Sequence, residues 1–377
     1  MAGIYLHIPF CKKKCHYCDF YKTLDTGLSD RFIASLIKEI KQRKNYLPEN
    51  SPISTVYFGG GTPSVLNISQ VRKVLKALDS FFSIDKDAEI SFEINPDDAD
   101  KSYLRDLKRE GINRLSTGVQ SWDDKYLKML NRRHDARQAH ESLETAREAG
   151  FDNISVDLIY GIPGMTPKEW EEALNTTFKL NLEHISAYHL TIEKNTMFGK
   201  MKDLGELVET DEEISEKHFA ILTDLARENN YIHYEISNLC REGYYSRHNT
   251  NYWRQVSYLG LGPSAHSYNG YSRQWNIPDI AEYLEKTDKG GIYFEREILD
   301  EKVRYNEYVM TSLRTIWGVD MNYIETSFNK ETHDYLLNLS SRFIKYGMIA
   351  RTEENNLVLT DQGKLISDNI ISELMMI

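Results

Sequence analysis

Short apolar runs rich in β-forming residues alternate with longer amphipathic stretches through the first half of the chain. There are six such runs: Gly3–Ile8, Ile53–Phe58, Glu89–Ile94, Asn113–Gly118, Asn153–Ile159 and His184–Leu190. Strands that alternate with helices pair in parallel, because each helix carries the chain back to the edge where the strand began. The pattern predicts an α/β fold, a partial parallel (β/α)6 barrel over residues 1–235.

The stretches between the runs show the three- and four-residue spacing of a helix with one buried face. Phe32, Leu36 and Ile40 share one face in the first of them. Val71, Val74 and Leu78 do so in the next, and Trp170, Leu174 and Phe178 in a later one. Ser29 and Thr166 stand where two helices should begin, so we expect both to act as N-caps.

The pattern becomes less regular after the sixth run. A helix is expected over Asp211–Asn229, followed by the apolar run Tyr231–Ile236. Residues 236–299, which include a passage rich in Gly and Tyr, are interpreted as an extension that closes the side of the barrel. Residues 300–377 show helices, two short apolar runs and a last helix from Thr360, an order typical of a winged-helix-like domain.

Charge argues against nucleic acid as a partner. The 377 residues carry a net charge of −11, and residues 301–377 hold 8 Lys and Arg against 11 Asp and Glu. A negative surface repels a phosphate backbone, so the winged-helix-like domain is expected to serve packing or protein contact. The first residues lack a secretory signal, and no apolar stretch approaches about 18 residues. We therefore expect a cytoplasmic protein that reaches a membrane only transiently, through partners.

Polar residues stand near the end of each predicted strand. They are the cysteine loop after the first, Gly59–Thr62 after the second, Glu93, Gln120, Asp157 and His189. The carboxyl ends of parallel barrel strands share one face, where ligands gather. These positions are therefore expected to line one site.

Three of the four cysteines form the motif Cys11-x3-Cys15-x2-Cys18. Three thiolates on one short loop can hold three corners of a [4Fe-4S] cluster and leave the fourth iron open for a small molecule, as an open zinc position receives water or substrate. A zinc site completed by His7 or His16 is the alternative, although structural zinc usually pairs cysteines across two knuckles. A redox dithiol would need only two of the cysteines. Cys240 stands alone and is interpreted as a buried thiol.

The segments Gly3–Phe20 and Tyr57–Pro63 resemble the radical S-adenosylmethionine family of oxygen-independent coproporphyrinogen III oxidases, and the resemblance runs through essentially the whole chain. The heme chaperone branch of that family is the more similar one. Phe20 stands where the oxidases have a further cysteine, His248–Trp253 matches the HNxxYW motif of the branch, and only ten residues precede Cys11. The oxidases carry a longer N-terminal arm.

The resemblance implies three cofactors: a [4Fe-4S] cluster on Cys11, Cys15 and Cys18, S-adenosylmethionine, and heme. The residues that it places at the cluster and adenosylmethionine are Tyr5, Tyr17, Gly60, Gly61, Thr62, Glu93, Gln120, Arg132, Asp157 and Ala187. His248 is a candidate axial ligand of heme iron, with His266 as a rival. The implied function is binding of heme and its transfer to acceptor proteins such as respiratory enzymes. The alternative is oxidative decarboxylation of coproporphyrinogen III.

Overall fold

The computed structural model describes residues 1–49 and 51–376. Six consecutive parallel strands form the centre of a twelve-stranded sheet. They are β1 (Ala2–Ile8), β2 (Ile53–Gly60), β3 (Ile84–Ile94), β4 (Arg114–Gln120), β5 (Ile154–Tyr160) and β6 (His184–His189). This confirms the predicted α/β class, and the main difference is that β3 begins five residues before its predicted start.

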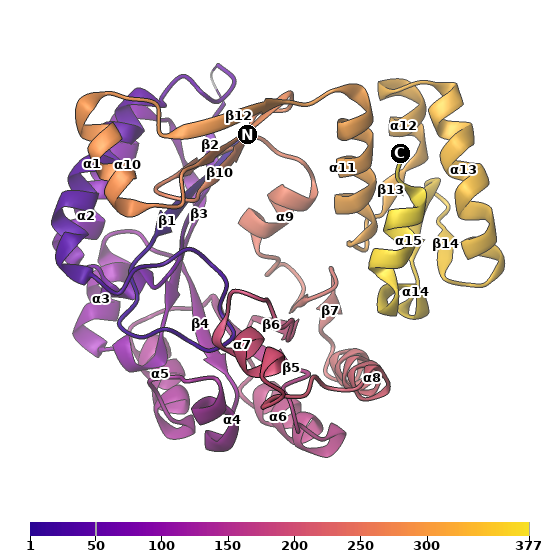
Figure 1. The fold of residues 1–377 in the computed structure, drawn as a ribbon, viewed down its shortest axis with the longest axis horizontal. Coiled ribbons are helices and arrows are strands. Elements are labelled where there is room, and N and C mark those ends of the chain that lie inside the picture. Colours follow the sequence, from indigo (N-terminus) through magenta and orange to yellow (C-terminus); the bar gives the residue numbers. More distant parts are fainter. Residues whose placement is uncertain (50, 377) are drawn as a thin grey trace.

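Helices cover the outer face of these strands (Figure 1). They are α1 (Ser29–Gln42), α2 (Ile68–Phe81), α3 (Lys101–Arg109), α4 (Asp124–Met129), α5 (Ala136–Glu148) and α6 (Pro167–Lys179). Single 3-10 turns occur at Thr26–Leu28, Pro63–Val65 and Pro96–Asp98. Alternate residues of a strand face opposite sides. In β1, Ile4 and Leu6 are completely buried in the core, whereas Tyr5 stacks on Tyr57 inside the barrel.

One of the two predicted helix caps is confirmed and the other is wrong. Thr166 caps α6, and its hydroxyl accepts from the backbone amide of Glu169 in a capping box. Ser29 is not a cap, because α1 already begins at that residue and follows directly on the 3-10 turn. Asp25 caps that turn instead by accepting from the amide of Gly27.

The chain beyond β6 lengthens the sheet at both ends. Its helices are α7 (Met197–Asp203), α8 (Glu212–Glu228), α9 (Arg247–Trp253) and α10 (Ile280–Lys289), and its strands are β7 (Ile232–His233), β8 (Asn238–Cys240), β9 (Tyr258–Leu261), β10 (His266–Tyr268), β11 (Ser272–Asn276) and β12 (Phe294–Ile298). β8 pairs with β6, whereas β9 pairs in parallel with β1. The chain that joins them, with α9, therefore crosses the open side of the barrel.

A buried carboxylate ties the extension to α1. Glu39 is completely buried, and its two oxygens accept from the amide of Gly262 (2.8 Å), the hydroxyl of Tyr283 (2.6 Å) and the side-chain amide of Asn276 (2.7 Å). Burial raises the pKa of Glu39, and Arg43 together with these donors opposes that shift. Three donors from the extension thus depend on one side chain.

We expect Glu39→Gln to lower the free energy of unfolding by about 2 to 4 kcal/mol, because the amide nitrogen of glutamine cannot accept a hydrogen bond and buried donors lose their partner. Urea unfolding followed by circular dichroism measures this loss. Glu285→Gln is the matched control, since Glu285 is an exposed residue of α10 that pairs with Lys289. Equal stability of the two variants would contradict the prediction.

The last part of the chain has its own core, with Tyr305, Leu336 and Leu357 completely buried. Its elements are α11 (Glu301–Leu313), β13 (Val319–Asp320), α12 (Met321–Ser327), α13 (Lys330–Lys345), β14 (Ile349–Arg351), β15 (Asn356–Leu359), α14 (Asp361–Leu365) and α15 (Ser367–Leu374). The strands form a sheet in the order β13-β15-β14 beside the barrel (Figure 1). Two helices stand where one was expected after Thr360. In the described part of the chain, no helix has the length and apolar character needed to cross a membrane.

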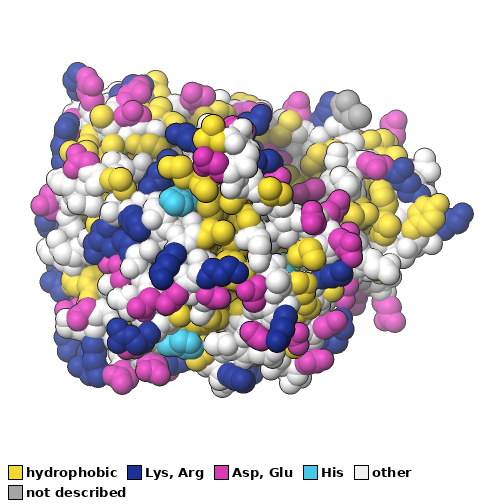
Figure 2. Space-filling view, turned by 60° about the horizontal axis from the view of Figure 1, so that its bottom comes forward, with side chains coloured by type: hydrophobic (Ala, Val, Ile, Leu, Met, Phe, Trp, Pro, Cys, Tyr) yellow, Lys and Arg dark blue, Asp and Glu magenta, His cyan; other side chains and the backbone are white. Residues whose placement is uncertain are grey.

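Charged side chains of both signs are interspersed on the face of the molecule shown in Figure 2, and no stripe of lysine and arginine crosses it. Hydrophobic side chains gather near the middle of the same face. On this face, side chains of opposite charge thus lie beside one another and do not form a field of one sign.

Candidate functional site

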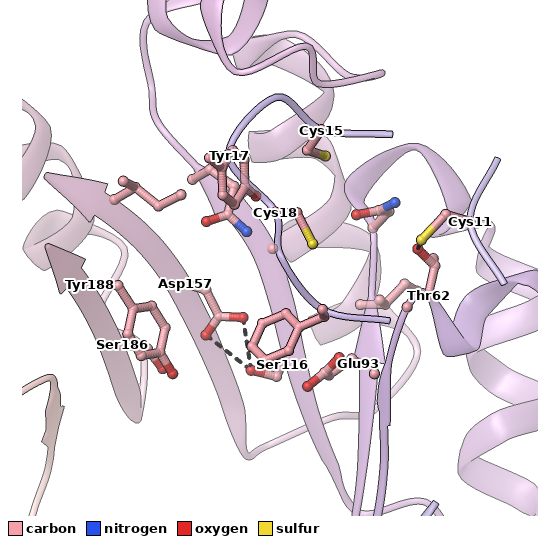
Figure 3. Close-up of a pocket in the computed structure, with 18 of the residues that line it drawn as sticks. Cys11, Cys15, Tyr17, Cys18, Thr62, Glu93, Ser116, Asp157, Ser186 and Tyr188 are labelled. Atoms are coloured by element: carbon pink, nitrogen blue, oxygen red, sulfur yellow. Dashed lines mark hydrogen bonds between the residues drawn. The ribbon is translucent and has the colours of Figure 1, made fainter. Parts of the chain in front are cut away.

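A cavity of about 600 Å³ extends through the barrel from the cysteine loop to the starts of β4, β5 and β6. This volume lies within the range typical of small-molecule sites. The three cysteines lie toward one end, and Glu93, Ser116 and Asp157 lie deeper, as Figure 3 shows. The carboxyl ends of the strands thus meet at one site, as predicted.

Cys11, Cys15 and Cys18 line the outer end of the cavity as free thiols. Two donors approach their sulfur atoms. The hydroxyl of Thr62 donates to the Sγ atom of Cys11 (3.4 Å), and Nη1 of Arg132 donates to the Sγ atom of Cys15 (3.3 Å). Hydrogen bonds to sulfur favour the thiolate form, which is the form that binds metal.

These thiols fit an iron–sulfur cluster better than zinc. The rings of the two candidate fourth ligands are held by backbone carbonyls, His7 by Tyr21 (2.9 Å) and His16 by Met129 (3.0 Å), and neither histidine lines the cavity. Across residues 1–49 and 51–376, no three His, Cys, Asp or Glu side chains are placed to hold one metal ion. The donor set is therefore three thiols on one loop, which is the set that a cubane with an open iron requires.

Glycine is required at the end of β2. Gly60 has φ of +106°, a conformation that other residues rarely adopt, and a Cβ atom on Gly61 would lie 2.8 Å from the carbonyl oxygen of Ile8. Both glycines and Thr62 line the cavity. The backbone of this turn can therefore approach a ligand closely.

Two carboxyl groups face the middle of the cavity. Burial, together with the nearby charge of Asp157, raises the pKa of Glu93 to about 7, against the hydrogen bond from the Tyr57 hydroxyl (2.9 Å). Burial also raises the pKa of Asp157 to about 6, against hydrogen bonds from Ser116 and Ser186. Burial disfavours the charged form of both carboxyl groups, and a positively charged ligand bound beside them would favour it.

Gln120 and Arg132 meet beside the cysteine loop. Gln120 ends β4 with φ of +68°, where the register with β5 shifts, and strained residues of this kind are frequent at functional sites. Arg132 donates through Nη2 to the side chain of Asn95 (2.6 Å) and to the carbonyl of Gly118 (2.7 Å), while its Nη1 contacts Cys15. The arginine therefore links β4 to the cysteine loop.

Most of the residues predicted for the site line the cavity. Besides the cysteines, they are Tyr17, Gly60, Gly61, Thr62, Glu93, Gln120, Arg132 and Asp157. Three predicted residues, Tyr5, Ala187 and His248, do not line it. Tyr5 lies inside the barrel beside the stacked rings of Tyr57 and His248, and Ala187 is 1% exposed in β6.

His248 is enclosed between α9 and the strands. It is 1% exposed, and its ring nitrogens are hydrogen-bonded to the hydroxyls of Thr55 (2.8 Å) and Tyr252 (2.8 Å). Burial lowers the pKa of His248 to about 3, so the ring is neutral. His266 lies in β10, is exposed, and also lies outside the cavity.

Sequence reasoning missed several residues of the cavity wall, among them Tyr57, Ser116, Ser186 and Tyr188. The hydroxyl of Ser116 donates to both oxygens of Asp157 (3.1 and 3.2 Å), which Figure 3 shows as dashed lines. A signal was present, because these polar residues alternate with apolar ones within β4 and β6 and therefore face the side opposite the helices.

The comparisons with known proteins agree with this geometry. The model of the Radical SAM superfamily matches residues 5–177. The heme chaperone HemW of Bacillus subtilis is 32% identical, with 100% of this chain and 99% of that protein covered. The heme chaperone HemW of Synechocystis is 33% identical, with 96% of this chain and 89% of that protein covered. This chain belongs to the HemW family of radical SAM proteins.

A solved structure supports the assignment. Coproporphyrinogen III oxidase (HemN) from Escherichia coli, described as a radical SAM enzyme, superposes with a TM-score of 0.85 at 26% identity and covers 100% of this chain and 90% of its own. The family resemblance and the fold class predicted from sequence are thus confirmed. Membership of the radical SAM superfamily implies a [4Fe-4S] cluster and adenosylmethionine, and the thiols and carboxyl groups of the cavity are suited to both.

Proposed function

We propose that this protein is a heme chaperone that binds a [4Fe-4S] cluster, adenosylmethionine and heme and passes the heme to acceptor proteins. The observation that carries the proposal is its similarity to HemW heme chaperones along the entire chain, from the cysteine loop to the last helix. Phe20 supports it, since this residue lies at the cavity with 72% of its surface exposed and stands where the resemblance to the oxidases implies a further cysteine.

Residues of the cavity would hold the first two cofactors. Cys11, Cys15 and Cys18 would bind three irons, and a reduced cluster with an open fourth iron can bind adenosylmethionine and supply an electron to it. The glycine turn with Thr62 would contact the methionine part. The carboxyl groups of Glu93 and Asp157 would accept hydrogen bonds from ammonium or hydroxyl groups.

The heme ligand stays a prediction. His248 is neutral and therefore able to coordinate iron, but binding would require that Thr55 or Tyr252 release one ring nitrogen. His266 is accessible without rearrangement. If His248 is the ligand, His248→Ala should remove or shift the heme absorption bands while the iron–sulfur absorption persists. An unchanged heme spectrum would rule out His248, and His266→Ala would then test the rival.

Coproporphyrinogen oxidation is the second candidate function, favoured by the full-length superposition on the oxidase from Escherichia coli. Cluster-reconstituted protein should be incubated anaerobically with adenosylmethionine, a reductant and coproporphyrinogen III, and protoporphyrinogen and carbon dioxide measured. We expect no product beyond the amount of protein. Repeated turnover would establish an oxidase, whereas heme binding without turnover, followed by transfer to an apo-cytochrome, is the result that supports the chaperone.

A further inference from the structure

The inner end of the cavity contains a buried arginine without an acidic partner. Arg114 begins β4, is 2% exposed and lines the cavity wall. Its Nη1 atom donates to the side-chain oxygen of Asn153 (2.7 Å) and the carbonyl of Tyr244 (3.5 Å). Within residues 1–49 and 51–376, its Nε and Nη2 atoms have no hydrogen-bond partner and its guanidinium forms no ion pair.

The titratable groups around Arg114 do not balance its charge. Burial, aided by Arg114, lowers the pKa of His184 well below its usual value, so this ring is neutral, and its nitrogens are hydrogen-bonded to Ser155 and Tyr234. Burial raises the pKa of Cys240 to about 12, so that thiol is also neutral. Asp157 is the carboxyl group that Arg114 influences, and it is hydrogen-bonded to Ser116 instead.

A buried guanidinium without a counter-charge is costly, whereas one that meets a bound anion is stabilised. Its two remaining nitrogen atoms, Nε and Nη2, match the two oxygens of a carboxylate, which arginine binds in a bidentate manner. Asn249 lines the same end of the cavity, and its side-chain amide makes no hydrogen bond in the described chain. The inner end therefore has the donors for a carboxylate.

This carboxylate would belong to a molecule other than adenosylmethionine. The methionine part of that cofactor, which carries its carboxylate, is assigned above to the glycine turn beside the cysteines, at the opposite end of the cavity. Ser246 and Asn249, on the segment that crosses the barrel's open side, line the inner end, so a group that reaches Arg114 projects into the barrel. A second ligand with a flexible acidic arm fits this arrangement.

We propose that Arg114 binds a propionate group of the tetrapyrrole cargo. The inference rests on the proposed function, because it takes the cargo to be a tetrapyrrole with free carboxylates. The inference assigns recognition of the acidic side chain of the cargo to Arg114, and this role is separate from coordination of the heme iron. The guanidinium of Arg114 would distinguish a porphyrin with free carboxylates from its ester. A carboxylate can form a charge-assisted, bidentate pair with the guanidinium, whereas an ester cannot.

Binding of iron protoporphyrin IX and of its dimethyl ester to the cluster-reconstituted full chain tests the proposal. Titration by absorbance should show the free acid bound at least about tenfold more tightly than the ester, the size expected for one charge-assisted pair. Arg114→Gln should lose this preference while its affinity for adenosylmethionine is unchanged. Arg147→Gln is the matched control, since Arg147 pairs with Glu183 and does not line the cavity.

Arg114→Lys keeps the positive charge but loses the bidentate geometry of the guanidinium. This variant replaces Arg114→Gln in the test if the glutamine variant fails to fold, as judged by cluster content and circular dichroism. It should weaken binding of the free acid only. Equal binding of acid and ester by the unmodified protein would overturn the inference and leave heme binding intact. Weaker adenosylmethionine binding by either variant would assign Arg114 to that cofactor and overturn it as well. Failure of the unmodified protein to bind either porphyrin would overturn the chaperone function itself.

Discussion

Replacing Cys15 by alanine is expected to abolish the iron–sulfur chromophore. Cys11, Cys15 and Cys18 are the thiols that line the cavity, so the loss of one would leave two irons of a cubane without a thiolate. Iron and sulfide per chain should fall close to zero after anaerobic reconstitution, and adenosylmethionine binding should be lost with them because the open iron is gone. Iron analysis and visible absorption measure the outcome.

The chain provides a matched control in Cys240→Ala. Cys240 is the fourth cysteine, completely buried in β8 and not part of the cavity wall. This variant should keep the full cluster and lose only the packing energy of a small buried group, about 1 to 2 kcal/mol. Equal cluster loss in both variants would contradict the assignment of the thiol loop, because it would show that folding rather than ligation controls cluster content.

Glu93→Gln is expected to have opposite effects on ligand binding and on stability. With Glu93 ionised, a hydrogen bond to a cationic ligand contributes about 1.5 to 3 kcal/mol, so adenosylmethionine affinity should fall about 10- to 100-fold. The protein without ligand should become more stable at pH 8. Burial raises the pKa of Glu93 from 4.5 to about 7, and a glutamine removes the cost of ionising the buried group, about 3 kcal/mol before other losses.

The sign of the pH effect follows from that raised pKa. The folded protein binds the Glu93 proton more tightly than the unfolded chain does, so the contribution of Glu93 to stability is present below pH 4.5 and is lost as pH rises to about 7. Unfolding of the unliganded protein measured between pH 5 and 8 should show this decline, and the Glu93→Gln variant should show less of it. A steeper decline in the variant would contradict the assigned pKa.

Glu235→Gln separates the two effects. Burial also raises the pKa of Glu235 to about 7, but this residue does not line the cavity. Its variant should remove the same cost of ionisation, less the loss of the hydrogen bonds that Ser237 and Asn238 donate to the carboxylate. It should leave adenosylmethionine affinity within about twofold of the original, as expected for a group that touches no ligand. Loss of affinity in both variants would indicate that the charge of the whole barrel interior, rather than a contact with Glu93, attracts the ligand.

The part of the fold that the sequence predicted well is the part controlled by local pattern. Apolar runs bounded by polar turns placed all six parallel strands, and a cysteine loop and a glycine turn can be identified without knowing what lies beside them. The strands β9 to β12 were missed because each is short and its sequence has no clear alternation of apolar and polar residues. Their pairing depends on contacts distant in sequence, such as β9 against β1 and Glu39 against Gly262.

The candidate site shows the same division. Glu93 and Asp157 stood out because a carboxyl group is rare in an apolar strand. Ser116 did not, because serine is common in strands and acquires significance only from its place opposite Asp157 in the barrel. His248 was singled out by its motif, but a motif does not reveal that Thr55 and Tyr252 enclose the ring. The sequence thus indicated which side chains could have a chemical role, whereas their exposure to the cavity depended on tertiary packing.

The place of β1 in the sheet has a practical consequence for protein production. β1 lies between β2 and β9, and Ala2, at its start, is completely buried and donates its amide hydrogen to Pro52. Deletion of residues 2–8 would therefore leave two unpaired strand edges in the middle of the sheet, and edges of that kind recruit other chains into aggregates. An affinity tag joined at this end therefore needs a flexible spacer, so that it does not disturb the pairing of β1.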